Sequence, residues 1–444
     1  MAQTYLTKQS PTAGNRQKGT LSMWVKRSKL GASQYIYSEW QDGQDHGIIY
    51  FSSADQLQII SNDGASASLQ IGTNRKFRDT NAWYHIVVAW DTTQATANNR
   101  VKLYVNGQQE TNLSTNSQPS QNFNTKFGLG SDYHIYIGRR GDNQDYFDGS
   151  MSHVHRVDNQ QLNASVFGST DSTTGEWNIT TSPSITYTGS SSFNFFILKD
   201  GNSVTDQSGQ SNNLTVGYGT LSKTEDCPSN VFATFNPLFL SLPTGGLSNG
   251  NTTATTAGAD STWRSAFGNL GATSGKYYME VKWVSGSHFV SGFASQKTLS
   301  THNFKDLTDV YSGGQYFGIY GTQLYTNGSA SGSYTTQASG NIIQLALDMD
   351  NKKIYQGING TWNVGGNPSS GNGISISGDT DEFWTFGISV YSNSGTGEYH
   401  ANFGNGYFAT TAVSSAGTNA SGNGIFEYDC PNGYTALSTK GLNT

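Results

Sequence analysis

The chain carries little charge for its size. Only 13% of its 444 residues are charged, whereas soluble domains typically have about 25%, so solubility has to come from neutral polar side chains. The 25 Lys and Arg residues are outnumbered by 31 Asp and Glu residues, which gives a net charge of −6. Because nucleic-acid binding depends on clustered positive charge, and the basic residues here are scattered, we expect no nucleic acid among the partners.

Long apolar runs are also missing. No run approaches the roughly 20 apolar residues that a membrane helix needs, so no membrane insertion is expected. The segment Met1–Thr20 lacks the apolar stretch of a secretory signal peptide. This predicts a protein that folds in the cytoplasm in which it is made.

Cysteine is scarce, with Cys227 and Cys430 as the two examples. Two cysteines are too few for a disulfide framework or for a zinc site of their own. Both stand in the tripeptide Asp-Cys-Pro, which leaves two interpretations open. They are unlinked thiols, or they form a disulfide that joins the two ends of one domain after release into an oxidising medium.

Aromatic and turn-forming residues are abundant. Aromatic residues make up 12% of the chain, and there are 53 glycines. Aromatic residues favour strands, and Gly and Asn favour tight turns, whereas disordered chains are poor in aromatics. No segment keeps a helical apolar pattern for three turns. The composition therefore predicts an all-β protein, and the length suits two domains.

Strand patterns recur in both halves. Val101–Val105 alternates and runs into Asn106-Gly107, a strong hairpin signal because both turn positions tolerate positive φ. Further strands are predicted at Leu21–Val25, Trp83–Trp90, Ile135–Gly138, Gly149–Val157, Phe193–Leu198, Tyr277–Val284, Ile342–Asp350 and Phe383–Val390. Short strands separated by frequent turns are typical of β-sandwiches, so we expect one sandwich in residues 1–225 and another in residues 226–444.

The first half resembles the laminin G type of the concanavalin A-like jelly roll. The resemblance is carried by LSMWVKRS at Leu21–Ser28, AWYHIVVAWD at Ala82–Asp91, VKLYVNGQQ at Val101–Gln109, IYIGRR at Ile135–Arg140 and FDGSMSHVHRVD at Phe147–Asp158. It implies two packed antiparallel sheets that bind glycan or protein more often than they catalyse a reaction.

The second half resembles SPRY domains, in a form found in marine phage proteins. The resemblance is carried by DCPSNVFATFNPL at Asp226–Leu238, SGKYYMEVKW at Ser274–Trp283, IIQLALDMDNKKIYQGINGTW at Ile342–Trp362 and CPNGYTALSTKGL at Cys430–Leu442. Together the two resemblances imply a tail-fibre, receptor-binding or capsid-decorating protein of a bacteriophage.

Some concanavalin A-like proteins hydrolyse polysaccharides, so the resemblance also allows for a catalytic site. A retaining glycosidase needs two carboxyl groups about 5–5.5 Å apart. Glu39 and Asp42 stand in a loop-like stretch with the wrong spacing for one strand face, and Asp348 and Asp350 close a strand before a turn. We therefore expect no catalytic residues and no enzymatic activity.

Loop residues that combine aromatic rings with planar polar groups are the candidates for ligand binding. Sugars have apolar faces and hydroxyl edges that such combinations recognise. The candidates are Trp40, Asp42, Asp45 and His46 in one loop, Tyr133, His134, Arg139 and Arg140 around another, and Tyr316, Tyr320, Tyr325 and Trp362 in the second domain. For each of them the alternative is packing or contact between subunits.

Metal binding has three possible locations. Laminin G-like domains often hold Ca²⁺ at a loop rim, and the resemblance makes Asp142 and Asp145 the candidate ligands. The loop Asp42–Asp45 is a second possibility, and an ordinary turn is the alternative for each. His153 and His155 are spaced i, i+2, which would place both on one strand face, where packing is the expected role. Calcium is thus the one candidate cofactor.

Taken together, the sequence predicts a virion protein of a bacteriophage. Its expected partners are other virion proteins and a host-surface glycan or protein, and a homo-oligomer is expected. A polysaccharide-degrading enzyme of the same fold and a non-viral bacterial lectin are the alternatives.

Overall fold

The computed structural model of the chain divides into two compact units, Met1–Leu221 and Ser222–Thr444. The sequence prediction placed this boundary four residues later, between residues 225 and 226. The structure describes residues 3–10, 12–64, 66–130, 133–188, 192–199, 203–240, 246–256, 258, 261–301, 306–309 and 314–443. Each unit is described by itself.

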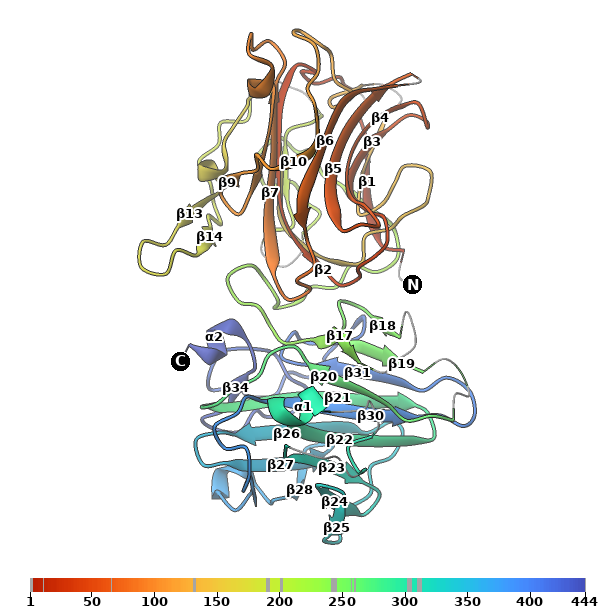
Figure 1. The fold of residues 1–444 in the computed structure, drawn as a ribbon, viewed down its shortest axis with the longest axis vertical. Helices are drawn as coiled ribbons and strands as arrows, with labels where there is room; N and C mark the ends of the chain where they lie inside the picture. Colours follow the sequence, from red (N-terminus) through yellow and green to blue (C-terminus); the bar gives the residue numbers. More distant parts are fainter. Residues whose placement is uncertain are drawn as a thin grey trace. The chain divides into compact units, whose positions relative to one another are not determined.

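The first unit consists of two antiparallel sheets packed face to face (Figure 1). The eight-stranded sheet has the order β10 (Leu113–Ser117), β6 (Ser66–Lys76), β5 (Gln56–Asp63), β4 (Asp45–Phe51), β3 (Gln34–Trp40), β11 (His134–Ile137), β1 (Tyr5–Gln9) and β16 (Thr215–Tyr218). The six-stranded sheet has the order β15 (Phe195–Ile197), β12 (Gly149–Asp158), β2 (Lys18–Arg27), β7 (Trp83–Asp91), β8 (Val101–Val105) and β9 (Gln108–Gln109). Their inner faces bury a continuous apolar core.

The predicted strands of this unit are confirmed, including the hairpin between β8 and β9. Its turn residues Asn106 and Gly107 have φ values of 47° and 79°, the positive values that the sequence pattern requires. Val101, Leu103 and Val105 point into the core, and the residues between them are half-buried. Period-two alternation thus places one face of β8 in the core.

The outer face of the six-stranded sheet is covered by residues 159–187. This segment includes the 3₁₀ turn η2 (Ala164–Val166) and the short hairpin of β13 (Gly168–Thr170) and β14 (Trp177–Ile179). It packs Phe167 and Trp177 against Val87 and Val157 of the sheet. Strand β7 is therefore buried on both faces, which explains why Ile86–Trp90 is a continuous apolar run.

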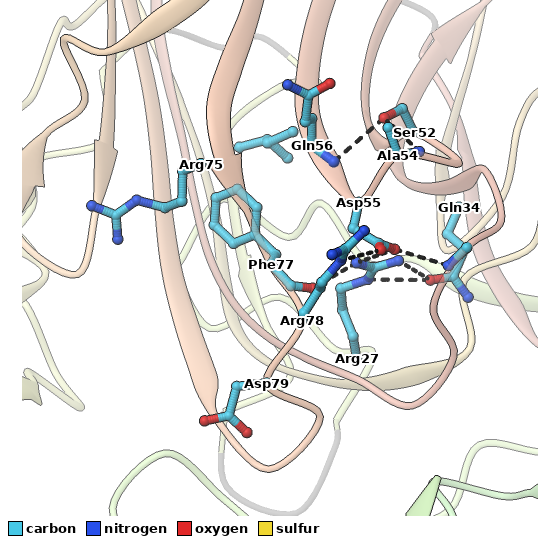
Figure 2. Close-up of polar contacts among 12 residues, drawn as sticks. Arg27, Gln34, Ser52, Ala54, Asp55, Gln56, Arg75, Phe77, Arg78 and Asp79 are labelled. Atoms are coloured by element: carbon cyan, nitrogen blue, oxygen red, sulfur yellow. Dashed lines mark hydrogen bonds and ion pairs between the residues drawn. The ribbon is translucent and has the colours of Figure 1, made fainter. Parts of the chain in front are cut away.

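A buried ion pair locks one end of this sandwich (Figure 2). Asp55, in the turn between β4 and β5, accepts from Arg27 of β2 at 3.2 Å and from Arg78 at 2.9 Å. Arg27 has no exposed side-chain surface, and its guanidinium also donates to the Phe77 carbonyl at 2.7 Å. Arg27 and Asp55 form the buried part of this contact, and the exposed Arg78 pairs with the same carboxylate; together they tie both sheets to the β4–β5 turn.

The second unit likewise contains two sheets, which are antiparallel except for the parallel pairing of the short strand β34 (Thr435–Ala436) with β21 (Lys276–Ser285). The seven-stranded sheet has the order β17 (Phe235–Leu240), β20 (Arg264–Gly268), β30 (Trp384–Tyr391), β22 (His288–Ser295), β23 (Tyr316–Tyr320), β24 (Gln323–Thr326) and β25 (Ser329–Ser331). The nine-stranded sheet has the order β18 (Leu247–Ser248), β19 (Thr253–Thr255), β31 (Glu398–Asn402), β21 (Lys276–Ser285), β26 (Ile342–Asp348), β27 (Lys353–Ile358) and β28 (Thr361–Val364), with β29 (Ile374–Ser375) beside β27 and β34 (Thr435–Ala436) beside β21. The predicted fold class, two tandem antiparallel β-sandwiches, is confirmed.

A row of glycines makes room on the outer face of the seven-stranded sheet. Gly292 pairs with Gly318 on one side and with Gly387 on the other. Leu307 lies against this row, and a Cβ at Gly318 would come within 2.3 Å of the Leu307 carbonyl oxygen. The close approach of a covering segment, rather than a turn, therefore explains glycine inside these strands.

The C-terminal segment is anchored on the nine-stranded sheet by the buried Glu280 of β21. Its carboxyl group accepts from the backbone N–H groups of Glu427 and Tyr428 at 2.8 Å each and from the Tyr278 hydroxyl at 2.9 Å. Burial raises the pKa of Glu280 from 4.5 to about 7, because the interior disfavours the charged form.

This raised pKa predicts that the second unit becomes less stable as pH rises. Between about pH 4.5 and pH 7 the folded state holds a proton that the unfolded state has lost. The free energy of unfolding should therefore fall by roughly 3 kcal/mol as the pH rises through this window. Glu280→Gln should remove that slope in thermal unfolding of the full chain at a series of pH values.

Val281→Ala is the matched control for this prediction. It removes a buried neighbour on the same strand that does not titrate, so it identifies the transition of the second unit and shifts it by the same amount at every pH. Equal slopes for the wild type and Glu280→Gln would contradict the prediction.

Candidate functional site

The two groups of candidate residues in the first unit lie side by side. Strand β3 pairs with β11 and with β4, so that Trp40 is opposite His134 on one side and His46 on the other. The rings of Trp40 and His46 are stacked, with centroids 4.6 Å apart and an interplanar angle of 12°. Sheet pairing thus unites residues that the sequence assigned to separate loops.

The acidic candidates near Trp40 have structural partners. Asp42 accepts from the backbone N–H groups of Gln44 and Asp45 at 2.8 and 2.9 Å, which makes a local turn. Asp45 forms a 2.7 Å ion pair with Lys126, which pairs with Asp63 at the same distance. These carboxylates shape the rim of the site.

Arg139 is held between two tyrosine rings. Its guanidinium carbon is 4.0 Å from the Tyr5 ring centroid and 4.1 Å from that of Tyr136, and the residue is only 4% exposed. Such cation–π contacts replace part of the lost hydration. Tyr133, another candidate, is buried and donates its hydroxyl to the Gln41 side chain.

Arg140 pairs with both candidate calcium ligands. It forms ion pairs with Asp142 at 2.7 Å and with Asp145 at 2.8 Å, and this contact lowers the pKa of Asp142. Among the described residues, no three His, Cys, Asp or Glu side chains gather to hold a metal ion. An arginine therefore occupies the position beside these carboxylates that a cation would take, and the calcium site stays a prediction.

Sequence reasoning missed several tyrosines of the same surface. Tyr35 and Tyr50 stack with centroids 4.6 Å apart, and Arg140 lies over the Tyr35 ring at 5.6 Å. We call the set Tyr5, Tyr35, Trp40, His46, Tyr50, His134, Tyr136, Arg139 and Arg140 the aromatic face. Its signal in the sequence was the alternate spacing of His134 and Tyr136, which places both on the side of β11 opposite the core.

The candidates of the second unit do not form one site. Tyr316 has no exposed surface and donates its hydroxyl to the Asp309 carbonyl, so its interpretation as a ligand contact is wrong. Tyr320 is half-buried, and its hydroxyl is 3.0 Å from His288 Nδ1, while Tyr325 is a half-buried residue of the neighbouring strand β24. Trp362, on β28 of the other sheet, lines a cavity.

Several of the carboxylates and histidines considered for catalysis or metal binding are in buried surroundings. Glu39 is in strand β3 rather than in a loop, and is fully buried. Asp348 is also buried, and forms an ion pair with Lys276 at 3.1 Å. His153 has a φ of 47° at a register shift of β12, and the rings of His153 and His155 both pack against Phe196, with centroid distances of 5.6 and 3.8 Å, in agreement with the expected packing role.

Both cysteines are free thiols, which is the first of the two interpretations that the sequence left open. The sulfur of Cys227 is 3.4 Å from Ser229 Oγ, and that of Cys430 is 3.5 Å from the Tyr434 carbonyl oxygen. Burial raises the pKa of Cys430 to about 12, so this thiol is protonated and unreactive at neutral pH.

Comparisons with known proteins match parts of the chain. A family model described as the concanavalin A-like lectin/glucanases superfamily matches residues 2–165. The first unit has a concanavalin A-like fold. None of the curated proteins matches the chain, and within the described ranges no helix is long and apolar enough to span a membrane.

Three solved structures are similar to parts of the chain. The SPRY domain of human HERC1 is 19% identical, with 38% of this chain and 96% of that chain covered and a TM-score of 0.29. A heptameric SAP-like pentraxin from Limulus polyphemus is 18% identical, with coverages of 36% and 71% and a TM-score of 0.27. Stonustoxin is 17% identical, with coverages of 38% and 27% and a TM-score of 0.26.

Proposed function

We propose that this chain is a non-enzymatic adhesive protein whose aromatic face binds a surface glycan or protein. The observation that carries the proposal is the stack of Trp40 on His46, with His134 on the neighbouring strand. An aromatic ring offers a platform for the apolar face of a sugar, and nearby imidazole and guanidinium groups donate hydrogen bonds to hydroxyl edges.

The acidic residues considered for catalysis already have partners within the protein, which supports a binding role rather than hydrolysis. Glu39 accepts the Tyr37 hydroxyl at 2.7 Å inside the core, and Asp348 is held by Lys276. A glycosidase would need a pair of carboxyl groups that reach the substrate. Incubation with host polysaccharide, followed by an assay for new reducing ends, tests this part; their appearance would contradict it.

We further propose that the protein is part of a bacteriophage particle, made in the host cytoplasm and assembled with other virion proteins as a homo-oligomer. Support comes from the resemblance of the two halves to domains found together in phage proteins. Purified virions probed with an antibody against the chain should be labelled, and unlabelled virions would refute this placement.

Replacing Trp40 with alanine is expected to weaken binding to host cells or their surface glycans at least tenfold. Loss of an aromatic platform costs about 1.4 kcal/mol or more in comparable contacts. Binding of labelled protein to whole cells measures the effect, and circular dichroism checks the fold. Phe383→Ala, which removes an exposed aromatic ring of the second unit, should bind like the wild type; equal losses in both variants would argue against the aromatic face.

A further inference from the structure

The second unit contains a cavity of about 380 Å³ that is separate from the aromatic face. Its walls come from strands β26 and β28, the turn before β28, the segment after it and the C-terminal segment, and they include Trp362, Asn367, Tyr428, Asp429 and Asn432. The volume falls in the range of about 300–1,000 Å³ that small-molecule sites occupy. None of its lining residues takes part in the function proposed above.

Two aromatic rings of the cavity are fixed by packing. Trp362 meets Tyr278 edge to face, with ring centroids 6.3 Å apart. Tyr428 lies against the turn residue Gly360, where a Cβ would come within 2.9 Å of the ring. Both residues are half-buried, so each combines a fixed position with surface that a ligand can reach.

Planar polar groups accompany these rings. The Asn367 side chain is oriented by accepting from Ser369 N at 2.9 Å, and Asp429 is oriented by Thr418, whose N–H and hydroxyl donate at 2.7 and 2.8 Å. Asn432 is exposed at the cavity. Among the described residues that line the cavity, Asp429 carries the one formal charge and no lysine or arginine is present.

We propose that this cavity binds a neutral saccharide. Fixed aromatic rings suit the apolar face of a pyranose, and amide and carboxylate groups can bridge its neighbouring hydroxyls. A negative carboxylate without a cationic neighbour in the lining disfavours acidic sugars. The chain then has one binding site in each unit, and simultaneous engagement of both would increase its avidity for a glycan-covered surface.

The test is a titration of the full chain with methyl glycosides of glucose, galactose, mannose and N-acetylglucosamine, in which binding is measured by saturation-transfer NMR. At least one of them should bind, and Trp362→Ala should raise its Kd about tenfold. Asn432→Trp should abolish binding, because a ring at this exposed position fills the cavity without touching the core. Ser329→Trp, on an exposed strand of the other sheet, should bind like the wild type.

Three results would overturn the proposal: no methyl glycoside binds, Asn432→Trp binds as well as Ser329→Trp, or the cavity prefers glucuronate or choline. Because Asn432→Trp does not depend on the packing of Trp362, misfolding of Trp362→Ala leaves the test intact. Trp40→Ala should leave this Kd unchanged, so failure of the cavity and failure of the aromatic face are distinguishable.

Discussion

Replacing Arg156 with methionine is expected to lower the free energy of unfolding of the first unit by about 3–5 kcal/mol at pH 7. Arg156 of β12 and Glu39 of β3 meet across the core, with 3.5 Å between Nε and Oε1, and neither side chain is more than 1% exposed. Burial raises the pKa of Glu39. Without Arg156, the carboxylate would lose its counter-charge in the interior, while methionine would still fill the space of the arginine stem.

The double variant Glu39→Gln/Arg156→Met shows how much of the lost stability is due to the unpaired buried carboxylate and how much to lost packing. The amide oxygen of glutamine can still accept from the Tyr37 hydroxyl, which donates to Glu39 at 2.7 Å. The amide nitrogen cannot accept from Gly128 N–H as the carboxylate does, so part of the lost stability should return. In the single variant the loss should shrink as pH falls, because Glu39 then takes up a proton. Urea unfolding of the full chain measures both; a double variant as unstable as the single one would speak against the ion pair.

This ion pair could not have been predicted from the sequence. Glu39 follows an alternating segment and precedes Trp40 and Gln41, which is why the sequence pattern indicated a loop. Arg156 is in a strand segment that was predicted, but alternation assigns a residue to a face without saying what lies opposite on the other sheet. Pairing across a core depends on long-range topology, which one sequence does not contain.

The hairpins were predictable because their information is local. The alternating run Val101–Val105 and the turn Asn106-Gly107 determine β8 and its partner β9 within ten residues. The aromatic face was half predictable for the same reason. Trp40 and His134 were found in polar, aromatic sequence, whereas Tyr35 and Tyr50 are embedded in apolar strands, where the pattern indicates core.

Coverage of the outer sheet faces escaped prediction. The segment Gly168–Leu221 is rich in Ser, Thr and Gly and gave one convincing strand, now β15. Its Trp177 nevertheless completes a buried layer over β7. A single aromatic residue in a polar segment gives no sign of what it covers, and so the contact of Trp177 with His85 was also missed.

Acid is expected to destabilise the first unit through His85, with a loss that begins near pH 6.5, before carboxylates start to titrate. His85 is stacked between Trp24 and Trp177, with centroid distances of 4.8 and 5.9 Å. Trp177 Nε1 donates to Nδ1 at 3.0 Å, so Nε2 carries the proton and faces Ser22 Oγ at 2.9 Å. The neutral ring is therefore fully hydrogen-bonded, and burial, followed by the neighbouring His153, lowers its pKa from 6.5 to about 3.

Proton binding determines the direction of this pH dependence. Below pH 6.5 the unfolded state binds a proton that the folded state binds only near pH 3. The free energy of unfolding therefore falls as the pH decreases through this window. The expected loss between pH 7 and pH 4 is roughly 3 kcal/mol. Burial also lowers the pKa of His155, which adds to the loss in the same direction.

The variant His85→Asn isolates this contribution from that of other groups. Its amide oxygen can replace Nδ1 as the acceptor for Trp177, but the smaller side chain should make the variant less stable than the wild type at pH 7. Because asparagine does not titrate, the gap between the two unfolding free energies should shrink by roughly 3 kcal/mol from pH 7 to pH 4. Val87→Ala, a buried change under the same covering layer, should keep a constant gap; parallel pH curves for His85→Asn and the wild type would show that the buried imidazole is not the acid-sensitive group.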